Sequence, residues 1–293
     1  MIVGCGYVGT RLAQRLASGH PVLAVVRSAA SAAALRARHI DAQQLDFDAR
    51  DVDLATLPEL AVGSAVFYLA PPAEQDASDP RVAKFLSALG NARPTAFIYM
   101  STTGVYGDTA GASVTEDAPL APSNDRSRRR VAAERLTAEW CAARQVRHVI
   151  LRVPGIYGPG RLPLERLQRG EPVLRPEDAG PGNRIHVDDL VSACVAALVS
   201  SASGAFNVTD GNHASTSEYF IATARLAGLR DPPLVTRAEA SSRISPGMLA
   251  YLGETRRVDN TRMREVLQVR LQYPDMRAGI AASLAEMHAT VRS

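Results

Sequence analysis

The chain has 293 residues, 46% of them hydrophobic, so it can bury a large core without disulfides or a structural metal. A net charge of +3, with arginines scattered rather than gathered beside aromatic residues, argues against a nucleic-acid surface. No run of about eighteen apolar residues and no basic segment before a long apolar run occurs, so we expect neither a membrane span nor a signal peptide.

The cysteines are the second compositional signal. Cys5, Cys141 and Cys194 are widely spaced and odd in number, a pattern that suits a reducing compartment better than a disulfide framework. We therefore expect buried core thiols and a cytoplasmic protein. His186 stands alone, without the spacing of a metal-ligand pair, so we expect no metal.

A glycine-rich turn stands between the first expected strand and helix. Gly4, Gly6 and Gly9 follow the apolar pair Ile2-Val3 and precede an apolar helical pattern. The first glycine permits a tight turn, the second lets backbone N–H groups approach a pyrophosphate, and the third lets helix and strand pack closely. These flanks predict a dinucleotide site formed by Gly4, Gly6, Tyr7, Val8 and Gly9.

Strands and helices alternate after this turn. Short apolar runs at 22–26, 65–69, 96–100 and 146–151 predict buried parallel strands, and residues 8–18, 29–38, 80–91 and 125–144 carry helical spacing. The alternation predicts an α/β fold with a doubly wound parallel sheet of the Rossmann type.

The end of the second strand indicates which dinucleotide binds. An acidic residue there would bond the ribose 2′-hydroxyl, whereas this chain has Arg27 and Ser28, which suit a 2′-phosphate. We therefore expect NADP(H) to be preferred over NAD(H), with an ordinary surface arginine as the alternative. Asp46 is a candidate acceptor for the adenine amino group, although a solvated loop carboxylate explains it equally well.

The pattern changes beyond the strand that ends near residue 152. A stretch rich in Pro and Gly, 154–182, predicts loops above the strand ends, followed by an ordered segment 185–187, a helix over 189–200 and a strand at 206–208. Ser215 and Glu218 have capping-box spacing for a helix to Leu226, and further helices are expected at 236–250 and 275–290. We assign 1–152 to a nucleotide-binding domain, whose sheet resumes at about 185–208, and 153–293 to a smaller, loop- and helix-rich substrate lobe.

Several segments together resemble a known family. They are the glycine turn 4–9, the run 99–107 that includes Val105-Tyr106-Gly107, Ala133-Glu134, the run 151–160, the run 184–190 and Phe206-Asn207-Val208. In this order and spacing the chain resembles the extended short-chain dehydrogenase/reductases, the NAD-dependent epimerase/dehydratase group. The resemblance implies a nicotinamide that exchanges hydride with substrate, with Thr102 bonding the reacting oxygen and Ala70 and Pro154 beside the cofactor. Thr102 serves equally well as a strand-end cap.

The family's Tyr-x-x-x-Lys proton relay is missing. Its two positions fall on Arg126 and Arg130, and Lys84 is the only lysine of the chain. Arginine stays charged throughout the accessible pH range, so it cannot act as a general acid or base. Either Arg130 keeps the ribose-holding and electrostatic task while a nearby tyrosine or water supplies the proton, or Arg126 and Arg130 together clamp an anion.

The remaining site candidates follow from these two alternatives. Tyr106 is our candidate proton donor, although packing explains it better. Candidate substrate contacts are Arg126, Tyr157, Arg161 and Arg184, with loop salt bridges as the alternative for the arginines. We expect an atypical NADP(H)-dependent oxidoreductase, epimerase or dehydratase acting on a small polar or anionic substrate, nucleotide sugars included. The alternative is a catalytically silent NADP(H) sensor or scaffold, and either form can be a homodimer.

Overall fold

The computed structural model describes residues 1–74 and 78–292. Within them a seven-stranded parallel sheet has the strand order β11-β7-β5-β4-β1-β2-β3. Its strands are β1 (Ile2–Val3), β2 (Leu23–Val26), β3 (Asp41–Gln44), β4 (Ala65–Tyr68), β5 (Ala96–Thr102), β7 (Arg147–Val153) and β11 (Gly204–Asn207). The strand order reverses between β1 and β4, which confirms the doubly wound sheet and creates a crevice at their carboxyl ends.

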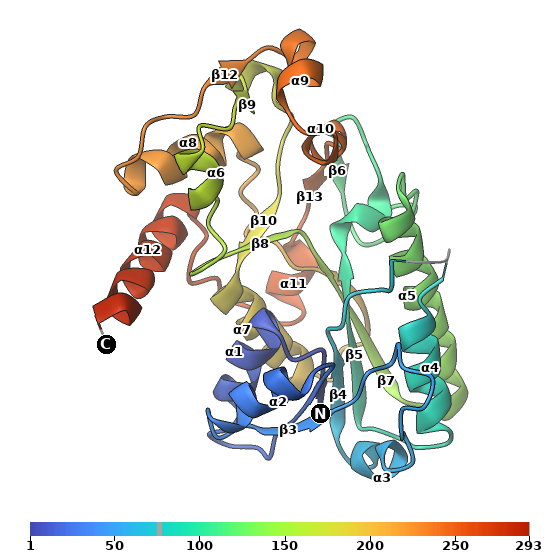
Figure 1. Cartoon of the computed structure of the whole chain (residues 1–293). Coiled ribbons are helices and arrows are strands. Elements are labelled where there is room, and N and C mark those ends of the chain that lie inside the picture. The colour runs from blue at the N-terminus through green and yellow to red at the C-terminus, as the bar shows by residue number, and fades with distance from the viewer. Residues whose placement is uncertain (75–77, 293) are drawn as a thin grey trace.

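Helices cover both faces of this sheet (Figure 1). One face carries α1 (Tyr7–Leu16), α2 (Ala29–Arg36), α7 (Val187–Val199) and α11 (Thr261–Glu265), and the other α3 (Leu57–Ala61), α4 (Pro80–Leu89) and α5 (Asp125–Arg144). Successive strand residues serve opposite faces: Ile2 packs in the core beneath α1, and Val3 packs in the core beneath α4. Both faces are apolar because the strands are buried on both sides.

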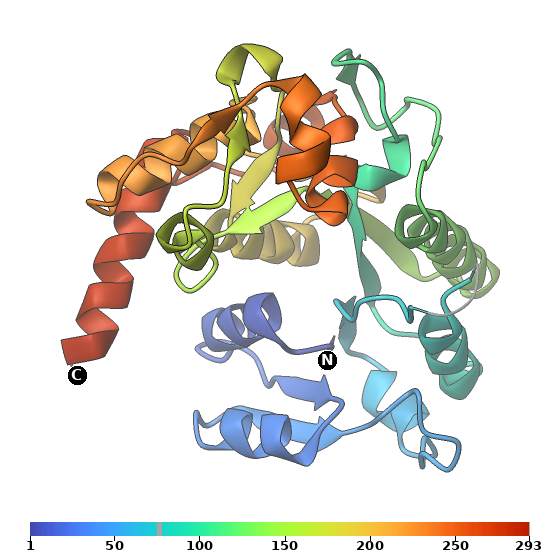
Figure 2. The same cartoon turned by 45° about the horizontal axis from the view of Figure 1, so that its top comes forward.

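The second lobe lies over the carboxyl ends of the strands (Figure 2). It contains three parallel strand pairs: β8 (Gly155–Tyr157) with β10 (Arg184–His186), β9 (Val173–Leu174) with β12 (Leu234–Val235), and β6 (Ser113–Val114) with β13 (Arg257–Val258). Its helices are α6 (Leu164–Gln168), α8 (Thr216–Leu226), α9 (Arg237–Arg243), α10 (Pro246–Gly253) and α12 (Met276–Arg292). A core of its own, which includes Phe220 and Ile280, joins α6, α8 and α12.

Two sequence expectations are corrected. The main sheet does not resume at 185, because β10 pairs with β8 above the sheet and only β11 returns to it. The helix expected over 236–250 is two helices, since α9 ends at Arg243 and Pro246 opens α10. The capping box of Ser215 and Glu218 at the start of α8 is confirmed.

The other compositional expectations concern thiols and membranes. Cys5, Cys141 and Cys194 are buried free cysteines, and burial raises the pKa of the Cys141 and Cys194 thiols to about 12. No helix within the described ranges is both long and apolar enough to cross a membrane.

Candidate functional site

The glycine turn lies at the reversal of strand order. Gly4 has φ of +79°, and a Cβ added there would stand 2.5 Å from the backbone nitrogen of Ala70, just after β4. A Cβ on Gly9 would approach Ile2 Cγ2 to 3.2 Å, whereas one on Gly6 would meet nothing within 4 Å. Gly4 and Gly9 therefore permit close packing, and Gly6 leaves open space at the N-terminus of α1, which is the shape that a pyrophosphate requires.

A first cavity of about 330 Å³ opens beside this turn. Its lining includes Gly4, Gly6, Arg27, Ser28, Ser31, Asp46, Phe47, Ala70, Pro71 and Arg81. Arg27 is exposed at the end of β2, and Ser28 caps α2 by accepting a hydrogen bond from the Ser31 backbone nitrogen at 3.2 Å. The lining supplies an exposed guanidinium, hydroxyls and a helix N-terminus, all of which bind phosphate.

Arg81, on α4, also lines the first cavity. Arg81 donates to both carboxylate oxygens of Asp48, at 2.7 and 2.5 Å, and to the Pro71 carbonyl at 3.1 Å. Asp46 accepts from the Asp48 backbone nitrogen at 3.0 Å, so its carboxylate shapes the loop after β3. The chain's own contacts thus tie the loops after β3 and β4 together. Sequence reasoning missed Arg81, because only the fold brings α4 beside Asp48.

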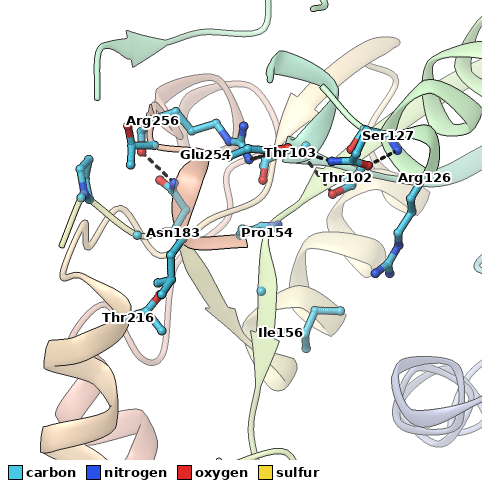
Figure 3. A pocket seen from close by; sticks show the side chains of 18 of the residues that line it. Thr102, Thr103, Arg126, Ser127, Pro154, Ile156, Asn183, Thr216, Glu254 and Arg256 are labelled. Atoms are coloured by element: carbon cyan, nitrogen blue, oxygen red, sulfur yellow. Dashed lines mark hydrogen bonds and ion pairs between the residues drawn. The ribbon is translucent and has the colours of Figure 1, made fainter. Parts of the chain in front are cut away.

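A second cavity of about 380 Å³ is lined by residues from the end of β5 and the start of α5 on one side and from the second lobe on the other. Figure 3 shows its lining side chains. Its lining includes Thr102, Asn124, Arg126, Ser127, Pro154, Arg161, Asn183, Thr216, Glu254 and Arg256. Thr102 is half-buried, and its Oγ1 accepts a hydrogen bond from the Gly104 backbone nitrogen at 3.2 Å. Arg126 is exposed and extends from α5 away from Thr102 and Ser127 (Figure 3). Four of the sequence candidates are thus brought to one cavity: Thr102, Arg126, Pro154 and Arg161.

The expected clamp of Arg126 and Arg130 is not formed. Arg130 is 7% exposed, and its Nη1 donates to the Met100 carbonyl at 2.8 Å and to the Tyr99 hydroxyl at 3.0 Å. The same nitrogen lies 3.5 Å from the Ala70 carbonyl, so Arg130 crosses beneath the ends of β4 and β5. Burial among backbone acceptors takes Arg130 out of the cavity that Arg126 lines.

Tyr106 is also placed differently from our expectation of a proton donor. Its ring is 2% exposed, and its hydroxyl donates to Asn207 Oδ1 at 2.7 Å and accepts from Arg152 at 2.9 Å. Arg152 is itself paired with Glu134 at 2.9 Å, and both side chains are buried. Burial, the largest effect, raises the pKa of the Tyr106 phenol although Arg152 opposes it. Tyr106 is part of a buried hydrogen-bonded network and does not line the second cavity, an arrangement that favours the packing role over that of a proton donor.

A third cavity of about 300 Å³ shares Gly155, Ile156, Arg161, Asn183 and Thr216 with the second. Its other lining residues are Tyr157, Pro163, Arg166, Arg184, Tyr219, Phe220 and Met248. Arg184 is 4% exposed, donates to the Ala214 carbonyl at 2.6 Å and stacks 4.7 Å from the centre of the Tyr219 ring. Tyr157 is 2% exposed and packs edge-on against Tyr219. The third cavity therefore has an aromatic and aliphatic wall beside its arginines.

Tyr7 and Arg161 join the glycine turn to the substrate lobe. The Tyr7 hydroxyl donates to the Pro159 carbonyl at 2.9 Å, and the Arg161 guanidinium lies 4.8 Å from the centre of the Tyr7 ring. Val8 is buried in the core beneath α1, so its side chain packs and only its backbone faces the turn. Arg161 lines both the second and the third cavity and stands at their junction.

Sequence reasoning missed the segment that closes the second cavity. Glu254 accepts hydrogen bonds from Ser123 and from Asn124, the latter at 2.8 Å, and pairs with Arg256 at 2.8 Å. Asn183 donates to the Arg256 carbonyl at 2.9 Å. The bonds to Glu254 join the start of α5 to a residue more than a hundred positions later. No local pattern in the sequence signals such a contact.

Comparison with known proteins finds a family model and a curated relative that match this chain. The family model described as "NAD dependent epimerase/dehydratase family" matches residues 1–209. A curated Streptomyces protein, "3-diazoavenalumate denitrifying reductase", is 31% identical over 138 residues, which are 45% of this chain and 45% of that protein. The match thus spans less than half of that reductase.

Solved structures resemble nearly the whole chain. A functionally unknown conserved protein from Silicibacter pomeroyi is 31% identical, with a TM-score of 0.82 and 97% of each chain covered. UDP-glucose 4-epimerase from Thermotoga maritima, solved with UDP-glucose, has the same TM-score of 0.82 at 18% identity, covering 100% of this chain and 99% of that one. The second likeness, at such low identity, concerns the fold.

Proposed function

We propose that this chain, which belongs to the NAD-dependent epimerase/dehydratase family, is an NADP(H)-dependent reductase of a small anionic substrate. One observation carries the proposal: the first cavity opens beside the glycine turn, and the second, with Thr102 and three arginines, lies under the second lobe. Ligands of open α/β sheets bind where the strand order reverses, which is where the turn stands. The similarity to a protein named a reductase favours reduction over epimerisation.

The preference for NADP(H) rests on the rim of the first cavity. Arg27 is exposed and lies beside the Ser28 and Ser31 hydroxyls. A guanidinium and hydroxyl groups at the end of β2 bind a 2′-phosphate, whereas an acidic residue there would bind a ribose hydroxyl. Asp46, whose carboxylate accepts from the Asp48 backbone, stays our candidate for the adenine edge.

The chain's own residues divide the remaining work. When bound, the nicotinamide supplies or accepts a hydride. Thr102 orients the acceptor group, and Arg130 places a fixed positive charge beneath the ends of β4 and β5. Arg126 and Arg161 draw the anionic group of the substrate into the second cavity, because neither pairs with a carboxylate among the described residues and guanidinium groups bind carboxylate and phosphate bidentately.

NADPH oxidation tests this function. The purified protein is incubated with NADPH and a panel that contains carbonyl acids, imino acids, nucleotide sugars and 3-diazoavenalumate. We expect turnover with an anionic member and a fall of about 10- to 100-fold in Thr102→Ala, the scale of one lost hydrogen bond to a developing charge. Thr109→Ala, outside the cavities, is the matched control. Absence of oxidation with every member would contradict the proposal.

A catalytically silent sensor of NADP(H) is the second candidate. It is favoured by the arginines at both positions of the family's Tyr-x-x-x-Lys relay. A sensor must distinguish NADPH from NADP⁺, so unequal affinities and a ligand-dependent change between monomer and homodimer, followed by light scattering, would support it. Equal affinities with an unchanged mass would remove it. In either form we propose a cytoplasmic protein, because its three thiols suit a reducing compartment.

A further inference from the structure

The second cavity contains few groups that can give up a proton near neutral pH. Among its described lining residues, the ionisable side chains are Arg126, Arg161, Arg256 and Glu254. Guanidinium groups keep their protons at accessible pH, and the hydroxyls of Thr102 and its neighbours are weaker acids still. Glu254 is therefore the one carboxyl group among the described residues that line this cavity.

Glu254 is held as a carboxylate. Partial burial raises its pKa, but hydrogen bonds from Arg256, Ser123 and Asn124, with the charge of Arg256, outweigh burial and lower the pKa overall. Its Oε1 accepts from Ser123 and Asn124, and its Oε2 faces Arg256 at 2.8 Å. A carboxylate so engaged closes the cavity and has no proton to donate.

Four described tyrosines lie near the cavities. The Tyr7 hydroxyl donates to the Pro159 carbonyl, and that of Tyr106 donates to Asn207. Tyr99 and Tyr157 are buried. The Tyr99 hydroxyl accepts a hydrogen bond from Arg130, whereas the Tyr157 hydroxyl has no partner among the described residues and is buried near Gly279, and Tyr157 lines the third cavity rather than the second. Each of these phenols has a pKa raised by burial. None of the four belongs to the lining of the second cavity.

We propose that this site reduces a carbon that is already cationic, the iminium carbon of an imino acid, rather than a neutral ketone. The inference rests on the proposed function and names its substrate class. The hydride of NADPH forms the new C–H bond, the C=N π pair becomes the nitrogen lone pair, and NADP⁺ and an amine result. This step balances without a proton from the protein. A ketone, by contrast, becomes an alkoxide that must be protonated.

The arginines favour an acceptor that also carries a carboxylate. Arg126 and Arg161 would repel a simple cation, but the carboxylate of an imino acid can pair with either guanidinium while the iminium carbon faces the cofactor. A guanidinium stabilises an alkoxide as well, yet it does not protonate one. An apolar substituent fits the third cavity, which begins at Arg161 and is lined by Tyr219, Phe220 and Met248.

Paired acceptors test the proposal. N-methyl-3,4-dihydroisoquinolinium-1-carboxylate has a permanent positive charge, and phenylglyoxylate offers the same aryl and carboxylate groups on a ketone. We expect kcat/KM for the iminium acid to exceed that for the ketone by at least about 100-fold, after subtraction of the uncatalysed rate, since a missing general acid costs a ketone that much. We also expect kcat for the iminium acid to be independent of pH between about 6 and 9, because no protein proton is transferred.

Variants at α5 test the role assigned to the carboxylate. Arg126→Gln should raise KM for the iminium acid by about 10-fold, the scale of a lost charged hydrogen bond, and lower KM for carboxylate-free N-methyl-3,4-dihydroisoquinolinium, because one repelling charge is removed. Arg128→Gln, whose guanidinium pairs with Asp125 on the exposed face of α5, is the matched control. An equal KM rise for both acceptors would contradict this role.

Failure of the inference is distinguishable from failure of the proposed function. Equal or faster turnover of phenylglyoxylate, or a pH-dependent kcat with the permanent cation, would overturn the inference and leave a reductase. Turnover of neither acceptor by protein that binds NADPH would overturn it too. Absence of NADPH binding by folded protein would instead remove the proposed function beneath it.

Discussion

The first and the second cavity are built in different ways. The first is shaped by backbone: a glycine turn, the N-terminus of a helix and loops that follow neighbouring strands. The second is shaped by side chains from distant segments, with Glu254 reaching α5 and the Arg152–Glu134 pair buried beneath. The comparison teaches that the proposed nucleotide end depends on local chain geometry, whereas the proposed substrate end depends on long-range polar contacts.

The largest expected effect concerns the buried network beneath the second cavity. Arg152→Ala should lower the free energy of unfolding by about 3–5 kcal/mol, because it leaves Glu134 as an uncompensated buried charge. Arg128→Ala, which removes an exposed pair with Asp125, should cost at most about 1 kcal/mol. Urea denaturation measures both. Similar losses in the two variants would contradict the claim that buried contacts hold the substrate end.

The first cavity should lose binding without losing stability. Gly6→Ala adds a methyl group into space that is open within 4 Å, so we expect an unchanged Tm and an affinity for NADPH lowered by at least about 10-fold. Gly4→Ala, at φ of +79°, should instead destabilise the fold by about 1–3 kcal/mol. Thermal melting and fluorescence titration separate the two effects. Full NADPH affinity in Gly6→Ala would place the pyrophosphate elsewhere.

The order of strands and helices was predictable, and the substrate end was not. The glycine turn and the helix over 125–144 follow from local spacing, and both are found where expected. The placements of Tyr106 and Arg130 were harder to predict. They depend on contacts with Asn207, Arg152 and the end of β5, which only the fold brings together. No local pattern distinguishes an arginine that faces a cavity, such as Arg126, from one buried a helical turn away.

A smaller effect should separate the two forms of the cofactor. Arg27→Ala removes a guanidinium at the rim of the first cavity, so we expect about 10-fold weaker NADPH binding and unchanged NADH binding. Arg38→Ala, on the exposed segment after α2, is the matched control. Fluorescence titration gives both dissociation constants. An equal loss for the two nucleotides would mean that Arg27 does not contact the 2′-phosphate.

The smallest expected effect is a pH dependence in the substrate lobe. Burial is the main cause that raises the pKa of Asp210 to about 7, with Asp189 adding to it and Arg184 opposing it. Since this folded-state pKa lies above the unfolded value, the contribution is complete in acid and is lost as pH rises through about 7. Asp210→Asn should therefore raise Tm by about 2–4 °C at pH 8 and have little effect at pH 4. An equal change at both pH values would contradict an ionisation effect.

Nucleotide affinity tests the central claim most directly. Isothermal titration calorimetry of the intact, folded chain with NADPH and with NADH should detect binding of both, tighter for NADPH because Arg27 and Ser28 line the first cavity, where we propose that the 2′-phosphate binds. Absence of heat with either nucleotide, from protein whose melting is cooperative, would contradict the assignment of the first cavity.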